Sequence, residues 1–207
     1  MFKNDNNNLA QKPIWGILRH ETYVVHDRLH VHPITSPLIT NNLTHNQYVL
    51  ALKAFKSFYR SLESSLENIS LPYVYSSRHD SIKKDLEYLG SSSHPYDDGL
   101  NLGHFSDKNY ALGVLYVVEG SSLGGQMIAK NVKKVLGYSK ESGASFFSGD
   151  KKKTAQNWKA FLMILEKHCD DHGKCVQGAL QTFEALEMLL WSVYDKSHNI
   201  STQRKVA

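Results

Sequence analysis

Hydrophobic residues recur at helical spacing along most of the chain, and the intervals between these stretches hold proline, glycine and asparagine. The first stripe covers residues 14–29, between Pro13 and Pro33. The clearest stripe follows Thr44 and Gln47, which form a capping box and so predict the start of an amphipathic helix. Its apolar members are Tyr48, Leu52, Phe55, Leu62 and Leu66, and the charged residues off the stripe are Lys53, Lys56, Arg60 and Glu63.

The second half of the chain predicts a short helix followed by three longer ones. The short helix stops at Gly90, and the longest is capped by Asp107 and stops at Gly137. A loop rich in serine, glycine, proline and aspartate covers residues 91–103. The predicted helices cover residues 82–89, 108–136, 150–165 and 176–193. Because no alternating run bounded by hairpin turns indicates a strand, the predicted fold class is all-α, with six to eight helices.

The length and the composition fit one folded domain. The chain has 207 residues, of which 41% are hydrophobic and 21% are charged, close to the averages of globular domains. The periodic segments place this domain at residues 13–195. Residues 1–12 predict a flexible, asparagine-rich lead, and residues 196–207 predict a flexible polar tail.

The charge balance and the cysteine content exclude several classes of protein. Lys and Arg number 24 and Asp and Glu number 20, and the net charge of +4 is too small for a committed nucleic-acid binder. It suits an anionic ligand or an acidic partner. The uncharged stretch 29–52 holds two prolines and paired asparagines, so it does not predict a membrane span. With only Cys169 and Cys175, and no secretory leader, the sequence predicts a cytoplasmic protein without a disulfide framework.

Three glycines lie close together in the middle of the longest predicted helix, where glycine is costly. Gly120, Gly124 and Gly125 each lower helix stability by about 1 kcal/mol relative to alanine. Gly120 and Gly124 are four residues apart and share a face. Either the glycines let two helices pack closely, or they let the helix bend over a flat ligand that needs backbone contact without intervening side chains.

His26 lies at the edge of the first apolar stripe, one turn after Thr22 and one turn before Leu29. A histidine in such a place is often a hydrogen-bonded core residue. A neutral imidazole that faces an apolar cleft is also a suitable axial ligand for heme iron. Arg19 lies two turns earlier on the same face, where its guanidinium can hold a propionate.

These two segments together resemble the heme oxygenase family. The segment with Arg19, Thr22 and His26 is similar to the proximal helix, in which the histidine four residues after the threonine binds iron. Residues 116–126, YVVEGSSLGGQ, are similar to the distal helix of bacterial members, especially those that accompany bacteriophytochromes. Supporting segments extend the resemblance over about residues 14–195.

The resemblance implies an oxidoreductase with heme sandwiched between a proximal helix and a kinked distal helix. Heme is then both substrate and oxygen-activating cofactor, and its cleavage at a meso carbon with O2 and external electrons gives biliverdin, carbon monoxide and ferrous iron. His26 is the implied metal ligand, and the implied catalytic residues are Gly120, Ser121 and Gly124. The residues implied to contact heme are Arg19, Thr22, His26, Gly120, Gly124, Gly125 and Lys159, the last as a second propionate anchor.

Two positions depart from the family pattern. Many members have an aspartate in the distal helix where this chain has Ser121, so the proton path must use water, backbone or another side chain. His30, one turn after His26, stands where the family often has an acidic residue that orders the ligand's second nitrogen. His30 can take over this task or compete with His26 for the iron.

Electrons must come from another protein, because the chain has neither a dinucleotide-binding fingerprint nor a cysteine cluster for an iron–sulfur centre. The resemblance implies a monomer that receives them from a ferredoxin or a reductase. Lys130, Lys133 and Lys134 lie just beyond the distal glycines and form a candidate docking patch for an acidic redox protein. The same lysines equally fit a solvated helix face.

Other interpretations rest on other features. His168, Cys169, His172 and Cys175 are zinc ligands by type, but their spacing matches no common finger and favours a polar helix break. Ser121 leaves open a heme carrier or sensor without turnover. Another alternative is a thiamin-salvage hydrolase, which needs a cysteine in its pocket. A di-iron oxidase needs several inward Glu and His residues, and the sequence has no Glu-x-x-His pair.

Overall fold

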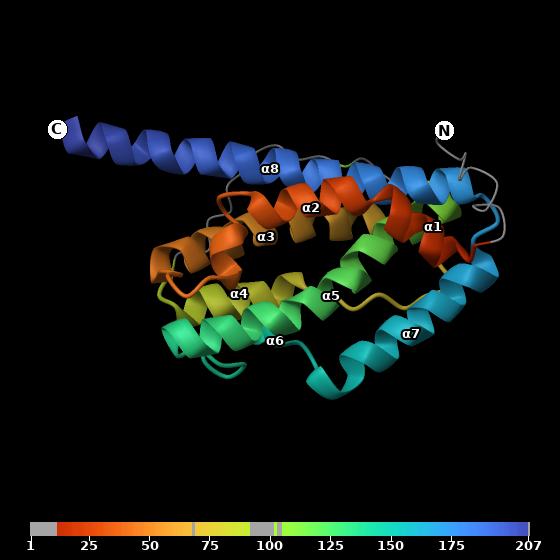
Figure 1. Cartoon of the computed structure of the whole chain (residues 1–207), viewed down its shortest axis with the longest axis horizontal. Helices are drawn as coiled ribbons and strands as arrows, with labels where there is room; N and C mark the ends of the chain where they lie inside the picture. The colour runs from red at the N-terminus through yellow and green to blue at the C-terminus, as the bar shows by residue number, and fades with distance from the viewer. Residues whose placement is uncertain (1–11, 68, 92–101, 103–104, 207) are drawn as a thin grey trace, which may run out of the picture.

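The computed structural model describes residues 12–67, 69–91, 102 and 105–206. Within this part of the chain every regular element is helical, with eight α-helices, one short 3-10 helix and no strand. The helices form one bundle, along which the longest helix, α8 (His172–Val206), runs from end to end (Figure 1). The all-α prediction is confirmed. The predicted lead and the loop at 91–103 lie almost entirely outside the described residues.

The first predicted helix is divided in two at Thr22. α1 (Ile14–Glu21) and α2 (Tyr23–Val31) meet at this residue, whose hydroxyl donates to the carbonyl oxygen of Leu18 at 2.7 Å. A threonine hydroxyl that bonds the carbonyl four residues earlier often bends a helix. The predicted stripe still faces the core, because Ile14, Leu18 and Val25 are buried.

After α2, the short 3-10 helix η2 (Ser36–Ile39) leads to α3 (His45–Leu66), which begins as predicted. The hydroxyl of Thr44 accepts the N–H of Gln47, and the Gln47 side chain accepts the N–H of Thr44. Lys56 differs from the expected pattern: it lies off the stripe but is buried. α3 packs against both α4 (His79–Tyr88) and α8, so its buried surface is wider than one stripe. Burial and the nearby Lys83 lower the pKa of Lys56.

The longest predicted helix is confirmed at both ends. α5 (Lys108–Leu136) begins after Asp107, whose carboxylate accepts the N–H groups of Asn109 and Tyr110. It ends at Gly137, which adopts the left-handed conformation with φ of 77° that glycine tolerates. α5 stays helical through Gly120, Gly124 and Gly125, and its path bends in the middle (Figure 1).

The remaining helices differ from the prediction mainly in length. α6 (Ser145–Ser148) is a single turn, too short to give a periodic signal. α7 (Lys151–His168) and α8 are separated by residues 169–171, so the polar cluster there is a helix break, as the sequence favours. α8 continues to Val206, through most of the predicted tail. None of the described helices is both long enough and apolar enough to cross a membrane.

The pair formed by α5 and α8 is the centre of the bundle, and two glycines bring their backbones into contact. A Cβ on Gly113 would overlap the carbonyl oxygen of Cys175, and a Cβ on Gly178 would overlap that of Tyr110. α1, α2 and α3 also pack against α8, whereas α6, α7 and η2 pack against α5. α8 therefore fixes the position of α2 relative to α5.

Candidate functional site

His26 lies in the first turn of α2, and its ring is partly covered and partly open to solvent. The ring meets Phe183 of α8 edge-on, with centroids 5.8 Å apart, and it meets His30 edge-on at 4.6 Å. Burial and the neighbouring His30 lower the pKa of His26, against an opposing effect of Asp27. The imidazole is therefore neutral at pH 7, with a lone pair available for a metal ion.

The three predicted glycines of α5 have different surroundings. No atom lies within 4 Å of the place where a Cβ of Gly124 would stand, so the backbone there faces open space. The corresponding position at Gly120 lies 3.5 Å from the indole of Trp158. At Gly125 this position lies 3.1 Å from the carbonyl oxygen of Phe147 in α6. Gly125 therefore lets two helices pack closely. Gly120 and Gly124 leave room beside the helix, whereas Gly125 allows α6 to approach.

Aromatic side chains and one cation lie beside Gly120. Trp158 of α7 and Tyr116 of α5 have ring centroids 5.5 Å apart. Burial raises the pKa of Tyr116, and the positive charge of Arg19 on α1 opposes this rise, which places the guanidinium near the phenol. Together these groups offer an apolar surface with a cation at its side.

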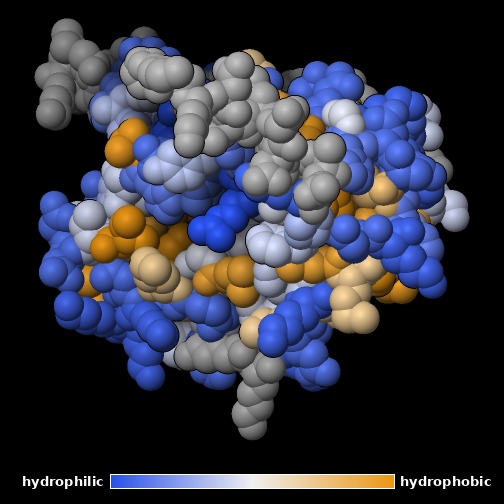
Figure 2. Space-filling view, turned by 45° about the vertical axis from the view of Figure 1, so that its right-hand side comes forward, coloured by the Kyte–Doolittle hydropathy of each residue, from blue (hydrophilic) through white to orange (hydrophobic). Residues whose placement is uncertain are grey.

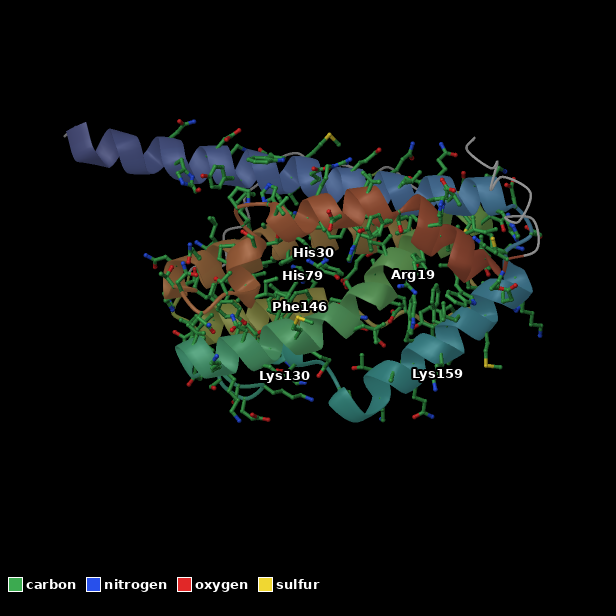
Figure 3. All side chains as sticks on the ribbon, in the orientation of Figure 1. Arg19, His30, His79, Lys130, Phe146 and Lys159 are labelled. Carbon is green, nitrogen blue, oxygen red and sulfur yellow. The ribbon has the colours of Figure 1, made fainter. Side chains whose placement is uncertain are left out.

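Lys159 is exposed on α7, whereas Thr22 is buried between α1 and α2. Lys159 follows Trp158 on α7 and is exposed, about 100° further round the helix than the indole that faces Gly120. Figure 3 shows Lys159 on α7 and Arg19 beside α1. Thr22 is buried, and its hydroxyl is held by the carbonyl of Leu18, so it shapes the bend between α1 and α2. Heme contact by Thr22 and Lys159 stays a prediction of the family resemblance.

Ser121 is the exposed end of a hydrogen-bonded chain that begins at the buried Tyr59. Its hydroxyl donates to the carbonyl oxygen of Val118 at 2.7 Å, and its Oγ lies 3.3 Å from the phenolic oxygen of Tyr59 on α3. Because the proton of Ser121 is directed to Val118, Tyr59 is the donor in the second bond. Burial raises the pKa of Tyr59, with Arg78 and the bond to Ser121 opposing it, so the phenol stays protonated at neutral pH.

A buried ion pair supports this chain from behind. Arg78 and Glu119 are 3.1 Å apart, and both side chains are largely buried. Burial and Glu119, which also forms a hydrogen bond with Tyr73, raise the pKa of Tyr73 to about 12. Glu63 of α3 accepts the N–H of Arg78 at 2.7 Å. These bonds hold the Arg78 guanidinium in place near Tyr59.

The sequence analysis does not identify this buried polar group, although one signal for it is present. Glu119 is a charged residue inside the apolar run 116–119 of a helix that is buried on most sides. A charge at such a position requires a partner, because an unpaired buried carboxylate is strongly unfavourable. Which residue supplies the partner depends on how α3, α4 and α5 pack, and Arg78 is 41 residues away in the sequence.

The polar cluster at the break between α7 and α8 holds two buried free thiols, Cys169 and Cys175. Within the described residues, no group of three or more His, Cys, Asp or Glu side chains is arranged to hold a metal ion. The four residues that resemble zinc ligands in type are therefore not gathered into such a group.

The overall match to known proteins decides the family. A family model described as heme oxygenase matches residues 13–190, most of the chain. This chain belongs to the heme oxygenase family. Comparison of the sequence with curated proteins gave no match.

Two solved structures share the fold of this heme oxygenase family member. The NO- and CO-bound heme oxygenase from Neisseria meningitidis is 23% identical, with a TM-score of 0.71, and the match covers 88% of this chain and 92% of that one. Heme oxygenase-1 from the cyanobacterium Synechocystis sp. PCC6803, in complex with heme, is 12% identical, with a TM-score of 0.66 and coverage of 95% and 100%. At these identities the likeness concerns the fold.

Surface hydropathy fits a flat, largely apolar ligand. On the face shown in Figure 2, hydrophobic residues gather in a band across the middle, bordered by hydrophilic ones. Near Gly124 on α5, the apolar side chains of Leu123 and Met127 are exposed. With the neutral imidazole of His26 and the cation of Arg19, the donor set suits heme, which needs an iron ligand, apolar contact and a charge for its propionates.

Proposed function

We propose that this chain is a heme oxygenase that cleaves heme to biliverdin, carbon monoxide and ferrous iron with O2 and external electrons. The observation that carries the proposal is the neutral, solvent-accessible imidazole of His26, which stands where the family resemblance expects the iron ligand. When bound, heme supplies both the iron that activates O2 and the ring that is opened. The residues of the chain bind, orient and supply protons.

Each part of the site has a separate task in this proposal. His26 holds the iron from one side, and Gly120 and Gly124 keep the opposite helix free of side chains, so that the macrocycle lies close to its backbone. Trp158 and Tyr116 cover an apolar edge. Arg19 pairs with a propionate, and Lys159 is a second anchor only if its long side chain folds back around α7.

The test of the proposal is heme added to the pure protein with ascorbate or with ferredoxin and its reductase, followed by absorbance. Loss of the heme band together with growth of a biliverdin band supports the enzyme. The second candidate function is a heme carrier or sensor, which is favoured by one observation: the proton of Ser121 is already directed to Val118. A ferrous–oxy complex that forms and then persists identifies the carrier.

Proton delivery is expected to depend on Tyr59 and Ser121. Because Tyr59 donates to Ser121 and stays protonated, a proton can pass from the buried phenol to the distal side when the serine hydroxyl turns away from the Val118 carbonyl. Tyr59→Phe and Ser121→Ala should each lower turnover about 10- to 100-fold, at the low end of the range for proton-transfer groups because water replaces them in part. Heme titrations should give unchanged affinity. Full turnover in both variants would show that protons travel another way.

The electron donor is expected to be an acidic protein that docks on a basic patch. Lys130, Lys133 and Lys134 are exposed near the C-terminal end of α5, although Lys134 also donates to Asn41 at 3.0 Å. In Figure 3, Lys130 lies on the side of α5 away from α2. Turnover driven by ferredoxin should weaken severalfold between low and physiological salt, since screening weakens steered encounters. A rate that is indifferent to ionic strength, or to Lys130→Ala with Lys133→Ala, would remove the patch from the account.

A further inference from the structure

α2 presents two histidines on one face. His26 and His30 stand at positions i and i+4 of the helix, so both side chains leave it in the same direction. Their ring centroids are 4.6 Å apart and their planes meet at 80°. Both residues are exposed, and Figure 3 shows His30 between α2 and α5.

This spacing is the one that two imidazoles need to share a cation. Imidazole nitrogens bind divalent first-row metals at about 2.0–2.1 Å, so two rings that bind one ion at angles of about 90–110° have centroids roughly 4.5–5.3 Å apart. The observed 4.6 Å lies inside that range. A shared ion therefore requires no movement of the backbone, only rotation of the two rings within their present positions.

Both rings are also available, unlike other histidines in the same region. Within the described residues neither the His26 ring nor the His30 ring takes part in a side-chain hydrogen bond or an ion pair. His20 instead lies 3.1 Å from the carboxylate of Glu21, and Nδ1 of His32 accepts the N–H of Ile34 at 3.1 Å.

We propose that His26 and His30 form a two-histidine site for a divalent first-row transition ion, with ferrous iron as its occupant in the working enzyme. The identity of this occupant rests on the proposed function, because ferrous iron is left when the heme ring is opened. His26 would then bind iron twice. It would first hold the iron of heme, and it would then share with His30 the ferrous iron that is left when the heme ring is opened. Only metal–ligand bonds are exchanged, and no electron is transferred. Neutral imidazole suits iron, cobalt, nickel, copper and zinc alike.

The test is a Co²⁺ titration of the heme-free, untagged protein, followed by visible absorption and by calorimetry. We expect one Co²⁺ for each chain, with at least about tenfold weaker binding in His26→Ala and in His30→Ala, because each removes one of two ligands. His20→Ala is the matched control and should bind as the wild type does. Added heme should displace Co²⁺, since both need His26. Equal Co²⁺ affinity in His30→Ala and the wild type would overturn the proposal.

Anaerobic Fe²⁺ titrations of the same variants test the occupant. The Fe²⁺ affinity should be lower in His26→Ala and in His30→Ala than in the wild type, as for Co²⁺. Each Fe²⁺ affinity should also be lower than the corresponding Co²⁺ affinity, as the general order of divalent metals requires. Fe²⁺ binding that does not depend on His30 would overturn the assignment of iron. These titrations contain no heme, so their outcome is separate from that of the proposed function: a wild type without heme turnover would contradict the enzyme, not the two-histidine site.

Discussion

Replacing His26 with alanine is expected to abolish the wild-type heme spectrum and to lower turnover about 100-fold or more, because the only proximal iron ligand is lost. Alanine is the best helix former, so α2 should remain intact. Heme should still enter, held by apolar contact and by Arg19. Ferric and ferrous–CO absorption spectra measure the ligation, and the biliverdin band measures turnover. Added imidazole should restore part of both, since the missing atom is supplied from solution.

The controls for His26 are its histidine neighbours. His20→Ala removes an exposed ring that pairs with Glu21, and it should leave the spectra unchanged. His30→Ala should keep the wild-type heme ligation, because the two-histidine site engages His30 only after the ring is opened. Unaltered spectra in His26→Ala, together with lost ligation in His30→Ala, would place the iron one turn further along α2.

Gly124→Leu is expected to give a protein that folds but binds heme at least about tenfold more weakly or fails to turn it over. A Cβ at Gly124 meets no atom within 4 Å, so a leucine side chain can extend into the space proposed for the macrocycle. The empty variant should be as stable as the wild type, or about 1 kcal/mol more stable, because leucine is the better helix former. Thermal unfolding and heme titration separate the two effects. Gly120→Leu meets Trp158 and should impair heme binding as well.

Gly113→Ala in the same helix provides the contrast to Gly124→Leu. Its added methyl group would overlap the backbone of α8 at Cys175, so the two central helices must separate. We expect a loss of about 3 kcal/mol or more in the free energy of unfolding, at the upper end for overpacking. Normal heme affinity and turnover in both Gly120→Leu and Gly124→Leu would show that the space beside those glycines does not hold the macrocycle.

The ends of the helices follow from local chemistry, and the sequence predicts them well for that reason. Thr44 with Gln47, Asp107 and Gly137 act on backbone groups within four residues of themselves, so no tertiary information is needed to recognise them. The division at Thr22 is also local, because it depends on the bond from the Thr22 hydroxyl to the carbonyl oxygen of Leu18. Apolar periodicity alone does not show whether a threonine makes this bond.

The roles of individual residues depend on packing and are harder to predict. Gly125 looks like Gly124 in the sequence, yet one faces the carbonyl of Phe147 and the other faces open space. The contact of Gly113 with α8 has no signature in its neighbours on α5. Lys56 is buried because α3 has two partners, which a single stripe does not reveal.

The candidate site also combines features that local sequence determines with features that packing determines. The sequence places Arg19 and His26 two helical turns apart, which predicts that they lie on one side of the first helical segment. The chain from Ser121 to Tyr59 joins residues that are 62 positions apart, and it exists because α3 and α5 are packed together in the bundle. Motifs therefore locate the two sides of the site, while the fold supplies the groups that connect them.

The central claim, that this chain opens the heme ring, is tested most directly by the stoichiometry of a single turnover. One equivalent of heme is bound to the protein, and reduced ferredoxin and O2 are supplied with catalase present to remove free peroxide. The account predicts one carbon monoxide, one biliverdin and one chelatable ferrous iron for each heme consumed. Heme that persists as a ferrous–oxy complex, or that is bleached without carbon monoxide and biliverdin, would contradict it.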